Sequence, residues 1–143
     1  MVKPVVSLAA LMIGMSAAAA SAQQCLHGAD ETPDQAVRRC EALTATRMLN
    51  TLQANGAGSR AGEYLRHDEL AAAPYALKMK QSADAATRRV SLDPLGDILP
   101  GWTLILEVAE KRYWFMIKDR TDPCGFAFFS NQDGLIYTAQ PLR

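Results

Sequence analysis

The stretch that decides the fold is residues 102–138, which read WTLILEVAEKRYWFMIKDRTDPCGFAFFSNQDGLIYT. Apolar residues alternate with others along much of it, and this period of two is typical of strands with one buried face. Turn-forming residues interrupt the alternation at 110–111, 120–123 and 131–134. The pattern predicts four short strands, over about 102–108, 113–118, 126–129 and 135–138. Strands joined by such tight turns pair as an antiparallel meander.

A long helix is predicted upstream of this sheet. Thr32-Pro33-Asp34-Gln35 has the form of a capping box with proline at the first helical position. A stripe then recurs at helical spacing, at Val37, Cys40, Thr44, Met48 and Leu52, and Leu43, Ala45 and Leu49 widen it. Asn55-Gly56 predicts the end of the helix, because glycine adopts the left-handed cap easily. We therefore expect an α+β fold in which one long N-terminal helix, over 33–54, packs on a four-stranded antiparallel β-meander.

The segment between helix and sheet gives a weaker signal. Asp68 can cap a short helix that Pro74 ends. Residues 75–80 fit a strand or a helix, because the alternation there is short. Both faces of the second and third strands carry aromatic residues, so the sheet face opposite the helix needs a cover. We expect either the 68–80 segment or a partner molecule to provide it.

Composition and charge exclude several classes of protein. The 143 residues are 49% hydrophobic and 21% charged, which excludes collagen-like, coiled-coil and wholly disordered chains. The 15 basic and 15 acidic residues leave no cationic surplus for nucleic acid. Basic pairs such as Arg38-Arg39 are expected on solvated faces. There is room for one domain.

Residues 1–22 have the three parts of a secretory signal peptide. Lys3 precedes an apolar run, and Ala20-Ser21-Ala22 makes a small-x-small cleavage site. A membrane anchor and a lipoprotein attached at Cys25 are the alternatives. We expect cleavage after Ala22, a single α+β domain over 23–143 with no membrane span, and a periplasmic or secreted location.

Export places the three cysteines in an oxidising compartment, where one internal disulfide is expected. Cys25 and Cys40 close the shortest loop, and the lead-in before the helix is long enough to fold back along it. The prediction is a Cys25–Cys40 disulfide and a free Cys124. Pairing of Cys124 with either of the other two is the alternative.

Candidate residues for catalysis or metal binding do not form a recognisable constellation. His27 and His67 lack zinc-ligand spacing and are expected as exposed loop residues. Asp119, Asp122 and Asp133 are expected to form turns, since they lack calcium-loop spacing. The sequence therefore predicts no catalytic, cofactor-binding or metal-binding residue, and no cofactor.

The aromatic residues of the sheet suggest a surface. Phe115 should face the helix, together with Leu104, Leu106 and Phe128. Trp114 and Phe129 would then share the opposite face as an apolar patch, and such patches mark interfaces. We expect an exported, non-enzymatic domain that binds another envelope or extracellular protein. A small periplasmic enzyme or small-ligand binder that uses Cys124 and nearby loop residues is the alternative.

The order of these elements resembles the globular heads of type IV pilin-like and pseudopilin proteins. The likeness runs from residue 33 to about 140 and is carried by 45–52 (ATRMLNTL), Tyr64, Leu70, 101–104 (GWTL) and 128–137 (FFSNQDGLIY). Pilin-like proteins keep a long apolar N-terminal helix with a glutamate just inside it. Here the apolar segment ends in Ala20-Ser21-Ala22, and the next helix begins with Pro33-Asp34. The resemblance implies the fold of a pilin-like head without its assembly stalk.

Overall fold

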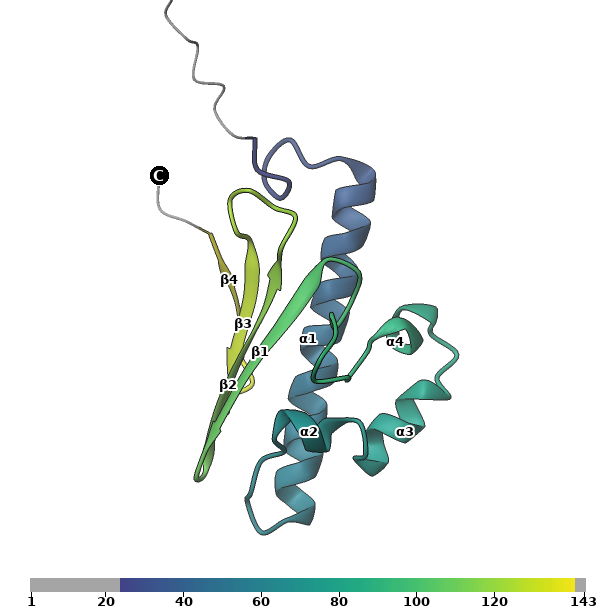
Figure 1. Ribbon diagram of the computed structural model, residues 1–143, viewed down its shortest axis with the longest axis vertical. Coiled ribbons are helices and arrows are strands. Elements are labelled where there is room, and N and C mark those ends of the chain that lie inside the picture. Colours follow the sequence, from purple (N-terminus) through teal and green to yellow (C-terminus); the bar gives the residue numbers. More distant parts are fainter. Residues whose placement is uncertain (1–23, 141–143) are drawn as a thin grey trace, which may run out of the picture.

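The computed structural model describes residues 24–140, and the predicted signal peptide at 1–22 lies outside the described residues. The helices are α1 (Pro33–Ser59), α2 (His67–Leu70), α3 (Pro74–Lys80) and α4 (Ala85–Arg89). The strands are β1 (Trp102–Ala109), β2 (Arg112–Asp119), β3 (Ala127–Asn131) and β4 (Ile136–Ala139). They form one antiparallel sheet in the order β1-β2-β3-β4, and α1 lies along it (Figure 1). The predicted α+β fold is confirmed.

Helix α1 begins as predicted but ends later. Thr32 and Gln35 form the capping box. The helix continues through Gly56 to Ser59, so the prediction of an end at 54–56 is wrong. Gly56 is needed for close packing instead, because a Cβ there would lie 2.6 Å from Leu65 Cγ.

The buried face of α1 agrees with the second half of the predicted stripe and differs from the first half. Its buried residues are Ala42, Ala45, Thr46, Met48, Leu49, Leu52, Gln53 and Gly56. The first half of the predicted stripe is wrong, since Val37 is 58% exposed and Cys40 is also exposed. The sheet-facing row starts with Arg38, whose guanidinium pairs with the buried carboxylate of Asp119. Because the first residue of this row is an arginine, a pattern of apolar residues alone does not reveal where the sheet-facing row begins.

The inner face of the sheet forms the core against α1. Trp102, Phe115 and Ile117 are almost fully buried, and Leu104 and Phe128 belong to the same cluster. The predicted burial of Phe115 with Leu104 and Phe128 is confirmed.

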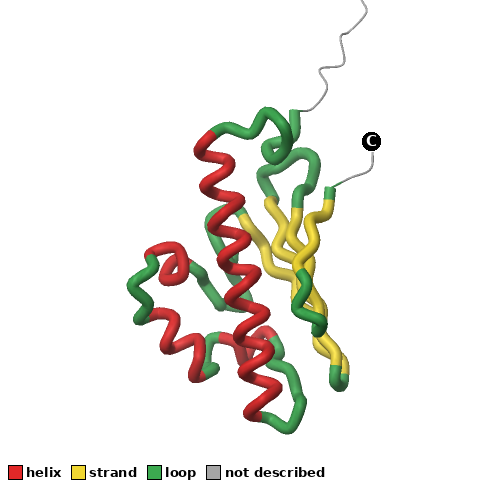
Figure 2. The backbone as a smooth tube through the Cα atoms, turned by 180° about the vertical axis from the view of Figure 1, so that it is seen from behind, coloured by secondary structure: helices red, strands yellow, loops and turns green. Residues whose placement is uncertain are grey.

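Helices α3 and α4 pack on α1 and not on the outer face of the sheet. Residues 74–80 are helical, which settles the open choice for 75–80. Helices α3 and α4 contact α1 and each other. Figure 2 shows them on the side of α1 away from the strands. The expected cover from the 68–80 segment is therefore absent from the outer face in the described part of the chain. Within residues 24–140, no helix is long and apolar enough to cross a membrane.

Candidate functional site

An apolar row crosses the outer face of the sheet from one edge to the other. Ile105 on β1 lies opposite Met116 on β2, Met116 opposite Phe129 on β3, and Phe129 opposite Tyr137 on β4. Direct cross-strand neighbours on one face have their Cβ atoms about 5 Å apart, so these four side chains touch in sequence. Trp114, two residues before Met116, extends the row along β2. We call these five residues the outer apolar row.

The aromatic members of the outer apolar row pack against one another, with the Trp114 and Phe129 rings stacked and the Phe129 and Tyr137 rings tilted. The ring of Phe129 lies 6.1 Å from that of Trp114 and 6.4 Å from that of Tyr137, centroid to centroid. Ile105, Trp114 and Tyr137 are 39%, 38% and 51% exposed, whereas the residues of the inner face are mostly buried. These three large apolar side chains are therefore on a face that nothing in residues 24–140 covers.

Trp114 and Phe129, to which the sequence points, thus lie together on the face opposite α1. Sequence reasoning missed Ile105, Met116 and Tyr137 as members of the same surface. Within β2 the pattern carries part of the signal, since Met116 lies two residues after Trp114 and so on the same face. Ile105 and Tyr137 lie on other strands. Only the register between strands shows that they form a continuous row.

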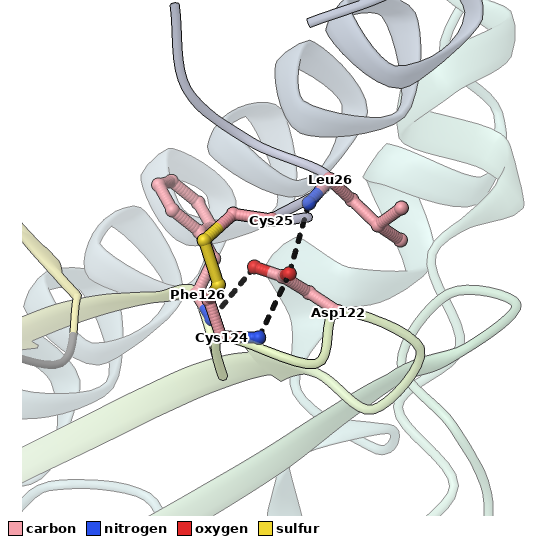
Figure 3. Close-up of a disulfide and its surroundings, with 5 residues drawn as sticks. All are labelled: Cys25, Leu26, Asp122, Cys124 and Phe126. Carbon is pink, nitrogen blue, oxygen red and sulfur yellow. Dashed lines mark hydrogen bonds between the residues drawn. A yellow bond between two sulfur atoms is a disulfide. The ribbon is translucent and has the colours of Figure 1, made fainter. Parts of the chain in front are cut away.

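The disulfide joins Cys25 to Cys124, with the two Cα atoms 5.2 Å apart, and Cys40 is a free, exposed cysteine. The predicted Cys25–Cys40 bond is therefore wrong. Cys40 lies on the exposed side of α1, whereas the lead-in before α1 crosses the loop that follows β2 (Figures 1 and 3). Cys124 has no thiol in this state, so it cannot serve as the catalytic nucleophile considered from the sequence.

Asp122 secures the same junction through its carboxylate. It accepts hydrogen bonds from the backbone N–H groups of Leu26, Cys124 and Phe126, at 3.0–3.1 Å (Figure 3). Asp122 is buried, and these donors compensate for the loss of water around its charge. The expected turn-forming role of Asp122 is confirmed, and the same side chain also anchors the lead-in.

His27 is the second attachment of the lead-in. It is 2% exposed, which corrects the expectation of an exposed loop histidine. Its Nδ1 lies 2.7 Å from a Glu31 oxygen, and its Nε2 lies 2.9 Å from an oxygen of Asp119. Its ring packs against those of Trp102 and Phe126, at centroid distances of 5.5 and 4.7 Å. Both ring nitrogens therefore lie within hydrogen-bonding distance of a carboxylate.

Two arginines from α1 complete the charge balance around His27. Arg39 donates to both carboxylate oxygens of Glu31, and this hydrogen bonding lowers the pKa of Glu31. Burial alone would raise the pKa of Asp119, but hydrogen bonds from Thr121 and His27 lower it below its usual range. Arg38 pairs with Asp119. The side chains of Arg38 and Arg39 remain about one third exposed, as expected for a solvated face, but each guanidinium pairs with a largely buried carboxylate, which the sequence did not indicate. We call the disulfide, Asp122 and the His27 network together the clasp.

The clasp has the properties of a structural element. Its carboxylates are engaged by donors, and among residues 24–140 no group of three or more His, Cys, Asp or Glu side chains is placed to hold a metal ion. Its histidine is buried, and both ring nitrogens contact carboxylates. The clasp therefore fixes the N-terminal lead-in to the end of the sheet, and the outer apolar row remains as the candidate site.

No protein-family model, no curated protein and no solved structure matches this chain. The class that the geometry defines is a disulfide-containing α+β domain, with a long N-terminal helix followed by a four-stranded antiparallel sheet.

Proposed function

We propose that this protein is an exported, non-enzymatic binding module whose outer sheet face holds another envelope or extracellular protein. The observation that carries the proposal is the outer apolar row, which spans all four strands and leaves Ile105, Trp114 and Tyr137 exposed. Contiguous exposed apolar patches mark interaction sites in monomeric proteins. Tryptophan and tyrosine are also the side chains that contribute most of the energy at protein interfaces.

The sheet presents this row on a rigid support. Behind it, Phe115 and Ile117 are buried in the core, and the rings of Trp114, Phe129 and Tyr137 restrict one another by contact. A surface that is already ordered loses little conformational entropy when a partner binds. Such a face suits recognition by shape and apolar contact.

Two features support an extracytoplasmic site of action. Residues 1–22 have the form of a signal peptide. The Cys25–Cys124 disulfide is a bond that persists in the periplasm or outside the cell. The resemblance to pilin-like heads supports the same interpretation at the level of the fold, since those heads also place a long helix against an antiparallel sheet. We do not propose filament assembly.

The enzyme or small-ligand alternative is not retained. It relied on Cys124 as a reactive group, and the sulfur of Cys124 is bonded to that of Cys25. The nearby Asp122 is occupied by three backbone donors.

A capture experiment with matched variants tests the proposal. The mature protein would be immobilised and exposed to the envelope fraction of its source organism, beside a Trp114→Gln/Tyr137→Gln variant. Leu95→Gln is the control, because Leu95 is 96% exposed and lies in the loop before β1. Each variant would be used after its melting temperature matched that of the wild type.

We expect one or more exported proteins to be retained by the wild type and the control, and at least about tenfold less by the double variant. Binding would then be repeated with the purified partner and the same three proteins. Equal retention by all three would contradict a binding role for the outer face.

A further inference from the structure

Two charged residues frame the outer apolar row. Lys118 lies on β2, two residues after Met116, and Glu107 lies on β1, two residues after Ile105. Because β1 and β2 are antiparallel, these two steps lead in opposite directions from the row. The register places Glu107 directly opposite Trp114, and Lys118 directly opposite Thr103. Arg112, two residues before Trp114 on β2, also lies on the outer face, on the same side of the row as Glu107. Lys118 is therefore the charge on one side of the row, and Glu107 with Arg112 lies on the other, separated from it by apolar side chains.

Lys118 and Glu107 are both exposed, and within residues 24–140 neither belongs to an ion pair or a side-chain hydrogen bond. Other charged residues of the fold are used internally, such as Arg39 with Glu31 and Arg60 with Glu69. The Lys118 and Glu107 side chains are thus available to a molecule that docks on the row.

We infer that the outer face takes a second copy of this chain, packed face to face about a two-fold axis that runs along the outer apolar row. This inference rests on the proposed function, because it takes the outer face to be an interaction surface. Both rows would coincide in the middle of the interface, which is the self-complementary arrangement of an isologous dimer. Sheets that pack in this way lie about 10 Å apart, a gap that two layers of side chains fill.

The charges select this axis. A two-fold axis along the row lays each strand over its own counterpart in the reverse direction. Lys118 of one copy, two residues after Met116, then lies over Trp114 of the other copy, two residues before Met116. Since Glu107 is the cross-strand neighbour of Trp114, the ammonium group meets an indole face and a carboxylate together. Symmetry makes this contact twice.

The other in-plane axis gives no such pairing. A two-fold axis parallel to the strands would exchange β2 with β3 and β1 with β4. Lys118 would then face Ala127, which is its neighbour on β3, and Glu107 would face residue 135 beside β4. Neither charge would have a partner of opposite sign. The axis along the row is therefore the one that pairs Lys118 with Glu107, and this pairing is the argument for a second copy in that orientation.

The size of the face sets the strength of the association. Four strands about 4.8 Å apart and five residues of about 3.3 Å each cover roughly 300 Å² of sheet per copy. Stable complexes bury about 800 Å² per partner. We therefore expect a weak dimer, with a Kd of roughly 0.1–1 mM, that another partner of the same face can displace.

Charge reversal with rescue tests the inference on the full mature chain. Sedimentation equilibrium would be measured from about 10 μM to about 2 mM protein, which brackets this Kd. The salt concentration would be about 20 mM, so that screening is weak. Lys118→Glu alone and Glu107→Lys alone should each weaken dimerisation about tenfold, because each creates two like-charge contacts. The double variant Lys118→Glu/Glu107→Lys should recover to within about threefold of the wild type, since it restores both pairs.

Lys111→Glu in the β1–β2 turn is the matched control, because it makes the same charge change off the row and should leave the dimer unchanged. A wild type that stays monomeric throughout, or a double variant no better than the single ones, overturns the inference. If the chain stays monomeric while Trp114→Gln/Tyr137→Gln still loses an exported partner, only the second-copy inference fails. If the outer face binds neither a second copy nor another protein, the proposed function fails with it.

Discussion

Removal of the Cys25–Cys124 disulfide is expected to cost the domain about 3–5 kcal/mol of unfolding free energy. The bond joins residues 99 apart in the sequence, so it closes most of the described chain into one loop. The chain-entropy model assigns about 4.7 kcal/mol to a loop of about 100 residues, and native disulfides of small secreted domains contribute about 2–5 kcal/mol. With an unfolding entropy of about 2.1 cal/mol/K per residue, this loss lowers Tm by roughly 12–20 °C.

The assay is thermal unfolding of three proteins under oxidising conditions. Cys25→Ser/Cys124→Ser should melt lower by the amount given above. Cys40→Ser should melt within about 2 °C of the wild type, because Cys40 is exposed and outside the core. Non-reducing peptide mapping should recover Cys25 linked to Cys124 and an alkylated Cys40. A low melting temperature for Cys40→Ser, with an unchanged one for the double variant, would refute the assigned pairing.

Three further predictions concern the core and the clasp. Phe115→Ala should destabilise the protein by about 3–5 kcal/mol in urea unfolding, because Phe115 is fully buried, and an unchanged midpoint would contradict the register. Gly56→Ala should lower Tm although alanine favours helices, because the new Cβ would collide with Leu65; a higher Tm would show that the loop moves aside at no cost. The fold lowers the pKa values of the Glu31 and Asp119 carboxyl groups. These two carboxylates therefore contribute fully to the free energy of unfolding above their ordinary pKa values of 4.5 and 3.8, and the contribution is lost as the pH falls below those values. Urea unfolding of the wild type from pH 7 to 2 should show this loss of stability, and the loss should be smaller for Glu31→Gln. Identical pH profiles for the two proteins would contradict the role assigned to Glu31.

The sheet could be predicted from the sequence because apolar residues alternate along β1 and β2, and in β2 this alternation matches one buried and one more exposed face. The alternation of apolar residues around Phe115 therefore predicts the strand, and the turns at 110–111 and 131–134 predict which strands pair. The capping box at Thr32 is a local motif, and it too is read correctly.

The face of α1 could not be predicted in the same way. Arg38 occupies a sheet-facing position because Asp119, distant in sequence, supplies a buried carboxylate. Val37 looks like a core residue only when this partner is unknown. A charge whose compensation comes from the tertiary fold cannot be recognised from local periodicity.

The clasp was missed for a related reason. Cys25 pairs with a cysteine 99 residues away, and His27 binds Asp119, which is 92 residues away. The preference for the disulfide that closes the shortest loop therefore predicts Cys40 as the partner of Cys25, where the structure has Cys124. The candidate site could be predicted only in part. Alternation places Trp114 on the opposite face from the buried Phe115, and Phe129 on the opposite face from the buried Phe128. The continuous row across four strands can be recognised only from the register between strands.

Photo-crosslinking at the outer face tests its role as an interaction surface most directly. A photoreactive aromatic amino acid would replace Trp114 in the exported protein, and in a control it would replace the exposed Leu95. After irradiation of the producing cells, we expect a discrete higher-mass adduct from position 114, whether with a second copy or with another exported protein, and none from position 95. No adduct from position 114, or the same adducts from both positions, would contradict binding through the outer apolar row.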